Sequence, residues 1–334
     1  MRPSPTAYVV AGLHVLGWGA LLLTAVSPLG IGLGVTAYLL GLRHAFDADH
    51  IAAIDNTTRR LLARGRRARG VGLWFSLGHA TIVSALCVLL ALGVGALAKS
   101  LVDPGSPLQV WTGVIGPVVS GVFLLLIGAA NILLLRHRRQ TGSHRHGGPA
   151  WALLGRFDAV IDRPSRMYVV GLLFGLGFDT ATEVGLLALA GTAASRAVPW
   201  STILILPVLF AAGMSLLDSA QGAMSRRAYS WGAEGGESKA RRYDLLVTGA
   251  SIVVALVIGI AELAGVALRS LPHPGGFARA LGELDLNVLG LVLTGALIVF
   301  WAGAVAWSGL ERRRPSVQRS PGTFDPQGPG GVPG

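Results

Sequence analysis

Charged residues and cysteine are both scarce in this 334-residue chain. Asp, Glu, Lys and Arg make up 13% of the residues, about half of the share in soluble proteins, whereas hydrophobic residues make up 52%. This composition excludes a disordered chain, a fibrous repeat and a disulfide scaffold, and it indicates a polytopic membrane protein. Cys87 is the only cysteine, so no disulfide can form within the chain, and its apolar neighbours predict a small core residue.

The charge that is present is mostly positive, with a net charge of +11. In a soluble domain this excess would suggest a nucleic-acid partner. Here most basic residues lie between apolar runs, which predicts that they face the anionic inner leaflet of a membrane and that no nucleic acid is bound. The chain also lacks the G-x-x-x-x-G-K-[ST] motif, so ATP use is not expected and no nucleotide-binding subunit is implied.

A helix needs about 20 apolar residues to cross a bilayer, and runs of this kind predict the fold class: an all-α integral membrane protein with eight transmembrane helices. The first run is interpreted as a retained helix rather than a signal peptide, because Pro28 follows it in a poor cleavage context. Residues 1–311 form the expected permease domain, and the Pro- and Gly-rich residues 312–334 are expected to be a disordered cytoplasmic tail. The expected spans are 8–27, 31–57, 71–98, 110–135, 167–193, 200–223, 244–268 and 286–308.

The basic residues predict the orientation of these spans. With eight spans, 23 of the 28 Lys and Arg residues fall on one side, four fall on the other, and Arg43 lies within a span. Because basic loops stay in the cytoplasm, both termini are expected to be cytoplasmic, and the protein is expected in the inner (cytoplasmic) membrane.

The second span carries an unusual density of charge, with six ionisable residues among the 13 from Arg43 to Asp55. Each charge at the bilayer centre costs about 3 kcal/mol on an insertion scale, so such a cluster indicates a functional site. The alternative is that this segment lies outside the membrane. The alternation of basic loops argues against it, because removal of the span would put basic loops on both sides.

Helical spacing places three of these side chains together. In a continuous helix, His44, Asp47 and His50 fall within an arc of about 120°, while Asp49 points to nearly the opposite side. Two imidazoles and a carboxylate suit Ni²⁺, Co²⁺, Zn²⁺ or Mn²⁺, and not Cu⁺, since no sulfur ligand is near. Two alternatives remain for Asp49. It could orient a ligand, or the helix could unwind here and present both faces.

Other spans add polar residues that are rare in lipid. His79 lies in the third span, and a single membrane histidine is more often a packed hydrogen bonder than a ligand. Asp179 and Glu183 are four residues apart in the fifth span, so their carboxylates share a helical face. Asp218 is another acid within an apolar run, and Glu262 is interpreted as an isolated structural residue.

Four of these segments together resemble the nickel/cobalt transporter (NiCoT) permease family. Arg43–Asn56 is similar to that family's R-H-A-[VF]-D-A-D-H-I signature, and Leu176–Glu183 is similar to its L-G-F-D-T-A-T-E motif. Phe75–Val83 resembles the third-helix motif F-x-L-G-H-[SA]-T-[VI]-V, and Gly213–Asp218 resembles G-M-x-L-x-D-T-x-D. The last motif departs from the family pattern, because Ser219 replaces the Thr and Gln221 stands where a second Asp is expected.

The resemblance implies an eight-helix inner-membrane permease that imports Ni²⁺ or Co²⁺ as its substrate, with no cofactor and no enzymatic activity. It also implies the metal-site residues, and it leaves the role of Gln221 and the metal preference open. The implied residues are His44, Asp47, Asp49, His50, His79, Asp179 and Glu183.

Two other functions remain open at this stage. Metal efflux uses similar ligands in related membrane folds, and uptake assays would separate the direction of transport. An intramembrane metalloenzyme would need an open metal position and a positioned base, and no H-E-x-x-H motif supports it. The sequence therefore predicts a secondary transporter for a divalent metal ion, with import as the expected direction.

Overall fold

The computed structural model is built of helices, with no strand among the residues that it describes. Those residues are 4–24, 28–92, 100, 103, 105–139, 161–177, 183, 185–190, 199–233, 237–269, 276, 288–293, 295–296 and 299. The elements are α1 (Pro5–Thr24), α2 (Pro28–His44), α3 (Ala48–Ala63), α4 (Val71–Ala91), α6 (Pro107–Arg139), the 3₁₀ turn η1 (Pro164–Arg166), α8 (Met167–Phe174), α10 (Trp200–Ala233) and α11 (Glu237–Arg269).

Five of these helices, α1, α4, α6, α10 and α11, are long and apolar enough to cross a membrane. A sixth crossing is formed if α2 and α3, which meet at a bend of 56°, count as one span. Large apolar side chains such as Leu22, Leu23 and Trp200 are exposed on these helices, as lipid contact requires. The all-α membrane fold predicted from the sequence is therefore confirmed.

The predicted spans and the observed helices agree in position where both are described. The fifth span is described only in part, by α8, Glu183 and residues 185–190, and most of the eighth lies outside the described residues. The count of eight thus remains a prediction, as do the two predicted domains. Cys87 is fully buried in α4, as its apolar neighbours predicted.

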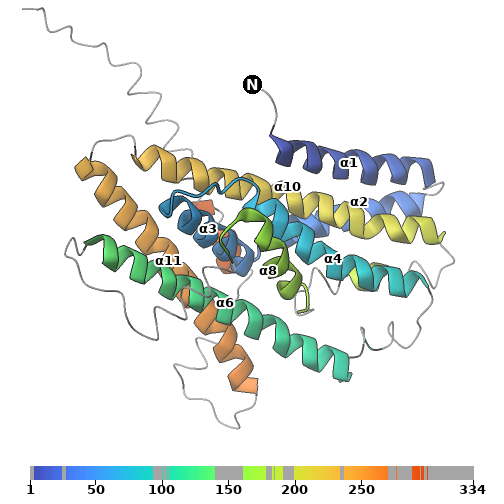
Figure 1. Ribbon diagram of the computed structural model, residues 1–334. Helices are drawn as coiled ribbons and strands as arrows, with labels where there is room; N and C mark the ends of the chain where they lie inside the picture. The colour runs from blue at the N-terminus through green and yellow to red at the C-terminus, as the bar shows by residue number, and fades with distance from the viewer. Residues whose placement is uncertain are drawn as a thin grey trace, which may run out of the picture.

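The helices pack around two hydrophobic clusters. In the first, α10 lies against α1, α2 and α4, with Leu206, Leu209 and Phe210 buried at the centre. In the second, α3 packs against α6 and α11, and Phe75 of α4 meets Phe174 of α8. Figure 1 shows α10 passing between α1 and α4, while α6 and α11 cross each other on the other side of α3.

Glycines bring the helices of the first cluster into backbone contact. A Cβ atom at Gly41 of α2 would overlap the backbone carbonyl of Phe210 in α10, and one at Gly72 of α4 would overlap that of Asp218. Small residues at helix interfaces permit this close approach in membranes, where van der Waals contact replaces the hydrophobic effect. As a result, side chains from α2, α4 and α10 can meet at one buried site.

The broken helix α2–α3 differs from the other spans in its composition. The segment Ala45–Asp47 separates the two halves, and almost every residue of α3 is buried whether polar or apolar. The second span was predicted to end at residue 57, before Arg59 and Arg60, but α3 continues to Ala63 and both arginines are buried within it, each 4% exposed. The predicted end was wrong because both cations have acceptors in the protein interior, which a count of apolar residues does not consider.

Candidate metal centre

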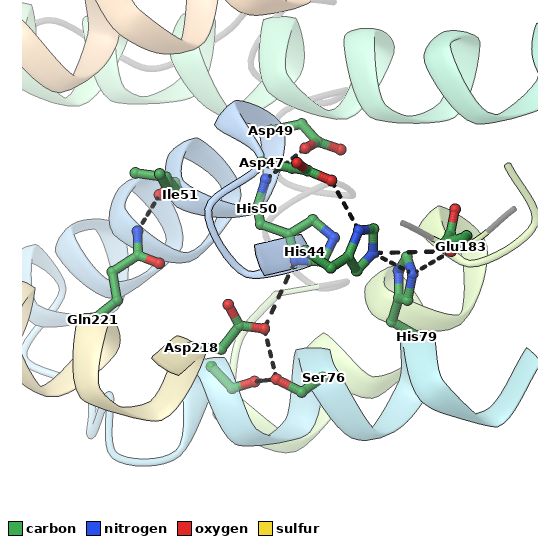
Figure 2. A network of polar contacts seen from close by, with 11 residues as sticks. His44, Asp47, Asp49, His50, Ile51, Ser76, His79, Glu183, Asp218 and Gln221 are labelled. Atoms are coloured by element: carbon green, nitrogen blue, oxygen red, sulfur yellow. Dashed lines mark hydrogen bonds and ion pairs between the residues drawn. The ribbon is translucent and has the colours of Figure 1, made fainter. Parts of the chain in front are cut away.

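Three of the predicted ligands, all histidines, meet at the centre of the helices. His44 ends α2, His50 lies in the first turn of α3, and His79 lies in α4. Their exposed fractions are 1%, 1% and 2%. One ring nitrogen from each lies within 4.8 Å of the others, and Figure 2 shows the three rings turned toward one another.

The helix break assembles this cluster. Asp47 is the N-cap residue of α3, with φ −63° and ψ 137°, but its carboxylate makes no capping hydrogen bond. Its Oδ2 atom instead lies 2.8 Å from Nδ1 of His44. Of the two arrangements that the sequence left open, the chain adopts the interrupted helix, so His44 and His50 reach the cluster from separate helices.

The polar contacts of the cluster fit a cation beside Nε2 of His79. Nδ1 of His44 lies 2.8 Å from Oδ2 of Asp47, although that oxygen has no hydrogen-bond partner among the described residues; with the proton of a neutral His44 on Nδ1, the lone pair is on Nε2. That Nε2 lies 2.9 Å from Nε2 of His79, which in turn lies 2.6 Å from Oε1 of Glu183. Two acceptors thus converge on one ring nitrogen with one proton. A cation in the place of that proton would have all three atoms as ligands.

The spacing of these donors also suits a first-row metal. Two ligand atoms at about 2.1 Å from one ion and at right angles to each other are about 3 Å apart. The separations of 2.9 Å and 2.6 Å within the His44–His79–Glu183 set are close to that value, and the third separation, between His44 Nε2 and Glu183 Oε1, is 3.9 Å. Imidazole nitrogens with one carboxylate oxygen are donors that Ni²⁺, Co²⁺ and Zn²⁺ accept.

His50 faces a carboxylate that is not among the site residues implied by the family resemblance. Its Nδ1 lies 3.7 Å from Oδ2 of Asp218 in α10, and it has no hydrogen-bond partner in the described part of the chain. Asp218 is fully buried, and its Oδ2 accepts a hydrogen bond of 2.6 Å from the hydroxyl of Ser76. Figure 2 shows the resulting chain from Ser76 through Asp218 to His50. In the sequence, Asp218 stands out as an acid within an apolar run, which indicates a role. The sequence does not show that its partner is His50.

Aromatic side chains enclose the histidines. The ring of Phe75 meets that of His50 edge-on at 4.7 Å, and the ring of Phe210 lies 5.5 Å from that of His44. Both phenylalanines are fully buried. These apolar walls leave little water near the polar atoms, and electrostatic attraction of a cation is stronger in such an environment.

The remaining predicted ligands have different surroundings. Asp49 turns toward α6: its Oδ1 accepts the backbone N–H of His50 at 2.9 Å, and its Oδ2 lies 3.5 Å from the hydroxyl of Ser120. The same hydroxyl donates to Glu262 at 2.7 Å, so Glu262 has a specific partner rather than the isolated position expected of it. Asp179 lies outside the described residues. Gln221 donates from Nε2 to the backbone carbonyl of Ile51 at 3.0 Å.

A second buried polar network lies further along α3, around Asp55. Its Oδ2 accepts from Nε of Arg59 at 2.8 Å and from the hydroxyl of Ser251 at 2.6 Å, and its Oδ1 accepts from the hydroxyl of Ser225 at 2.5 Å. This carboxylate therefore has protein partners on both oxygens.

Asn56, the next residue, is equally well bonded. It donates to the carbonyls of Ala52 and Ser251 at 3.0 Å and 3.1 Å, and its side-chain oxygen accepts from Asn131 at 3.0 Å. Such a fully bonded set joins α3 to α6, α10 and α11 and offers no coordination position.

The family of high-affinity nickel-transport proteins (NicO) matches residues 30–307 of the chain. The chain is 45% identical to the nickel transporter NicT of Mycobacterium tuberculosis, over 89% of this chain and 86% of that protein. It is 36% identical to the high-affinity nickel-transport protein NixA of Helicobacter pylori, over 90% and 95% of the two chains. It is 38% identical to the cobalt transport protein NhlF of Rhodococcus rhodochrous, over 90% and 91%. No solved structure matches the chain.

Proposed function

The chain belongs to the family of high-affinity nickel-transport proteins, a family of transporters and not of enzymes, and from this premise we propose that it imports Ni²⁺, Co²⁺ or both across the cytoplasmic membrane. The observation that carries this proposal is the convergence of His44, His50 and His79 from three helices within 4.8 Å. A divalent cation loses its water shell on entering such a buried site, and nitrogen and carboxylate ligands replace that shell.

The negative charge near the histidines supports a divalent substrate. Asp47, Glu183 and Asp218 each place a carboxylate oxygen within 4 Å of one of the histidine rings. A buried divalent ion needs such charge to offset its lost hydration. Asp179 is proposed as a further contributor, because it precedes Glu183 by one helical turn in the sequence.

Import is the direction proposed here. A membrane potential that is negative inside favours inward movement of a cation by about 2.3 kcal/mol per charge for each 100 mV. A secondary transporter can use this energy by alternating access to a central site. The broken helix α2–α3 supports that mechanism, since discontinuous helices build the substrate sites of many secondary transporters.

The test of this function is uptake of radioactive nickel by whole cells that express the full chain, with unlabelled Co²⁺, Zn²⁺ and Mn²⁺ as competitors. We expect saturable uptake for which Co²⁺ competes more strongly than Mn²⁺, because Co²⁺ binds imidazole nitrogens more tightly than Mn²⁺ does. A fall in cellular nickel on expression would contradict import and support efflux. His14→Ala is a matched control, since His14 lies in α1 and bonds to Tyr38 rather than to the cluster.

Span five is tested by Asp179→Asn and Glu183→Gln. Both amides retain most hydrogen bonds but remove the negative charge that the metal needs, so the apparent affinity for Ni²⁺ uptake should fall steeply at constant membrane abundance. Unchanged affinity in both variants would assign span five to the scaffold and leave α2, α3 and α4 as the binding site.

The orientation proposed for the chain has both termini in the cytoplasm. It is tested by a cysteine introduced at Gly334 in a Cys87→Ala background and treated with a membrane-impermeant thiol reagent. We expect labelling only after the membrane is opened. Labelling of intact cells would contradict the eight-span topology.

A further inference from the structure

A cavity of about 590 Å³ lies apart from the histidine cluster, between the beginning of α1, the beginning of α4 and the later part of α10. Thr6 and Ala7 line it from α1, Gly70 and Val71 from the start of α4, and Arg226 from α10. Because two helices begin here and α10 nears its end, the cavity lies at one end of the helix bundle. That is the level of a membrane at which lipid headgroups are found.

Two arginines line this cavity. They are Arg69, which is exposed, and Arg226, which is half-buried. Their like charges act on each other, yet neither has an ion pair with an acid in the part of the chain that the structure describes. Arg59 and Arg66, by contrast, both pair with aspartates. Two neighbouring guanidinium groups without an acid are complementary to an anion, and guanidinium binds phosphate oxygens with paired hydrogen bonds.

The start of α4 adds positive potential on the same side. Its N-cap residue is Gly70, which has φ of 83° and no side chain with which to cap the helix. Val71 and Gly72, whose amides belong to the first helical turn, line the cavity beside Arg69. Amides of a first turn have no acceptor within their own helix and are a common anion-binding feature. The hydroxyl oxygen of Ser219, another lining residue, is buried with no hydrogen-bond partner among the described residues.

The rest of the cavity wall is mostly apolar and reaches the outside of the bundle, and its other polar residues are Ser4, Thr6, His14 and Tyr38. Val10, Ala11 and Leu216 line it, and both Ala11 and Leu216 are exposed on the helix surface where lipid chains would lie. A ligand here would therefore meet cationic groups at one end and a hydrocarbon-compatible surface at the other. This combination matches an amphiphile better than a free ion, whose contacts would end at the arginines.

We propose that this cavity binds an anionic glycerophospholipid, with Arg69 and Arg226 holding its phosphate and the apolar wall contacting the start of its acyl chains. The bound lipid joins α1 to α4 and α10. This inference concerns a site separate from the histidine cluster and does not rest on the proposed transport function.

The experiment uses the purified full chain in detergent, with lipid retention measured by native mass spectrometry and thermal stability measured in parallel. The probes are phosphatidylglycerol, phosphatidylcholine and inorganic phosphate. We expect phosphatidylglycerol to be retained and to raise the melting temperature, with phosphatidylcholine and inorganic phosphate giving little of either effect. Arg69→Gln and Arg226→Gln should each weaken phosphatidylglycerol binding by about tenfold, because each removes a charge-assisted contact to phosphate.

The matched control is Arg67→Gln, which removes an exposed arginine of the same loop that does not line the cavity. This change should leave phosphatidylglycerol binding unaltered. Equal losses from all three arginine variants would overturn the proposal in favour of general attraction to a basic surface. Equal binding of inorganic phosphate would overturn it in favour of a free-anion site. Stabilisation by Ni²⁺ should survive in all three variants, which separates failure here from failure of the transport proposal.

Discussion

Two buried polar clusters lie along the same broken helix, and they differ in how completely their hydrogen bonds are made. Around Asp55, both carboxylate oxygens have donors, and the amide of the neighbouring Asn56 is fully bonded. In the histidine cluster, Nδ1 of His50, Nδ1 of His79 and Oδ2 of Asp47 have no hydrogen-bond partner in the described residues. Each cluster is enclosed by protein, so exposure does not explain the difference.

This difference in hydrogen bonding indicates different roles for the two clusters. A buried polar group without a hydrogen-bond partner lowers the free energy of unfolding. A protein therefore keeps such groups mainly where another interaction, such as ligand binding, needs them. The Asp55 carboxylate and the Asn56 amide are fully bonded without a ligand and hold α3 against its neighbours, although Nη1 of Arg59 has no hydrogen-bond partner in the described residues. The histidine cluster brings one ring nitrogen from each of His44, His50 and His79 within 4.8 Å of the others, and a metal ion there would take these nitrogens as ligands. We therefore propose a structural role for the Asp55 cluster and substrate binding for the histidine cluster, and the following substitutions test both roles.

The largest effect is expected from the histidines. His44→Ala and His50→Ala should each reduce nickel uptake to the background of cells without the protein, since each removes one of the nitrogens that replace the ion's water shell. The measurement is the initial rate of uptake at equal membrane abundance. Folding should survive, because neither histidine joins the Asp55 network. Near-normal uptake in either variant would remove that residue from the site.

The next effect is expected on stability and not on binding. Asp55→Asn leaves the buried Arg59 without its counter-charge, and breaking a buried ion pair in this way costs about 3–5 kcal/mol. The melting temperature in detergent should fall accordingly. Added Ni²⁺ should still raise it by the same increment as in the wild type, since a ligand stabilises any folded state that binds it. In His50→Ala the pattern should be reversed, with normal stability and no increment. If Asp55→Asn abolished the increment instead, the two clusters would not be independent.

A smaller effect is expected from the support of His50. Asp218→Asn keeps the size of the side chain but removes the charge that faces the His50 ring, and groups that orient metal ligands typically contribute about 10- to 100-fold in affinity. Isothermal titration with Ni²⁺ would measure it. Ser76→Ala removes the donor to Asp218 and should cost less, about 1 kcal/mol. Equal affinity in Asp218→Asn and the wild type would show that Asp218 has no part in binding.

The smallest effect is expected at Gln221. Its amide donates a hydrogen bond to the backbone carbonyl of Ile51. Because Ile51 lies within α3, where backbone carbonyls accept helical hydrogen bonds, the contact from Gln221 adds little to its stability. Gln221→Ala should change stability by no more than about 1 kcal/mol and leave nickel affinity within about twofold. A large loss of affinity, measured in the same titration, would place Gln221 in the substrate site instead.

The histidine cluster could be predicted in part because charged and imidazole side chains are rare in lipid. His44, Asp47 and His50 were selected by their number and spacing, and the structure brings them together with His79 and Glu183. The helix break was left as an alternative, since no Pro or Gly marks Ala45–Asp47. Asp47 is a preferred N-cap residue, which was a usable signal, although its carboxylate contacts His44 instead of capping the helix.

Contacts between distant segments could not be predicted in this way. The hydroxyl of Ser76 meets Asp218, which lies 142 positions later in the chain, because Gly72 allows α10 to approach α4. Periodicity describes one helix at a time and contains no information on which helix lies beside it. For the same reason the second span was predicted to end at residue 57, before Arg59 and Arg60, although Asp55 and Asn131 accept hydrogen bonds from these two arginines in the interior. The apolar helices themselves were easier to predict, since composition alone defines them.

The break between α2 and α3 also has an electrical consequence. Where one helix ends and another begins, the carbonyl end of the first carries about −0.5 of an elementary charge and the amide end of the second about +0.5. At the Ala45–Asp47 break these two ends lie close together, so their fields largely cancel. The potential at the histidines is then set by the side chains, with Asp47 and Asp49 next to the break. Substitution of Asp47 or Asp49 by a neutral residue would therefore change the electrostatic potential at a bound cation by the effect of one charge, while the backbones of α2 and α3 stay the same.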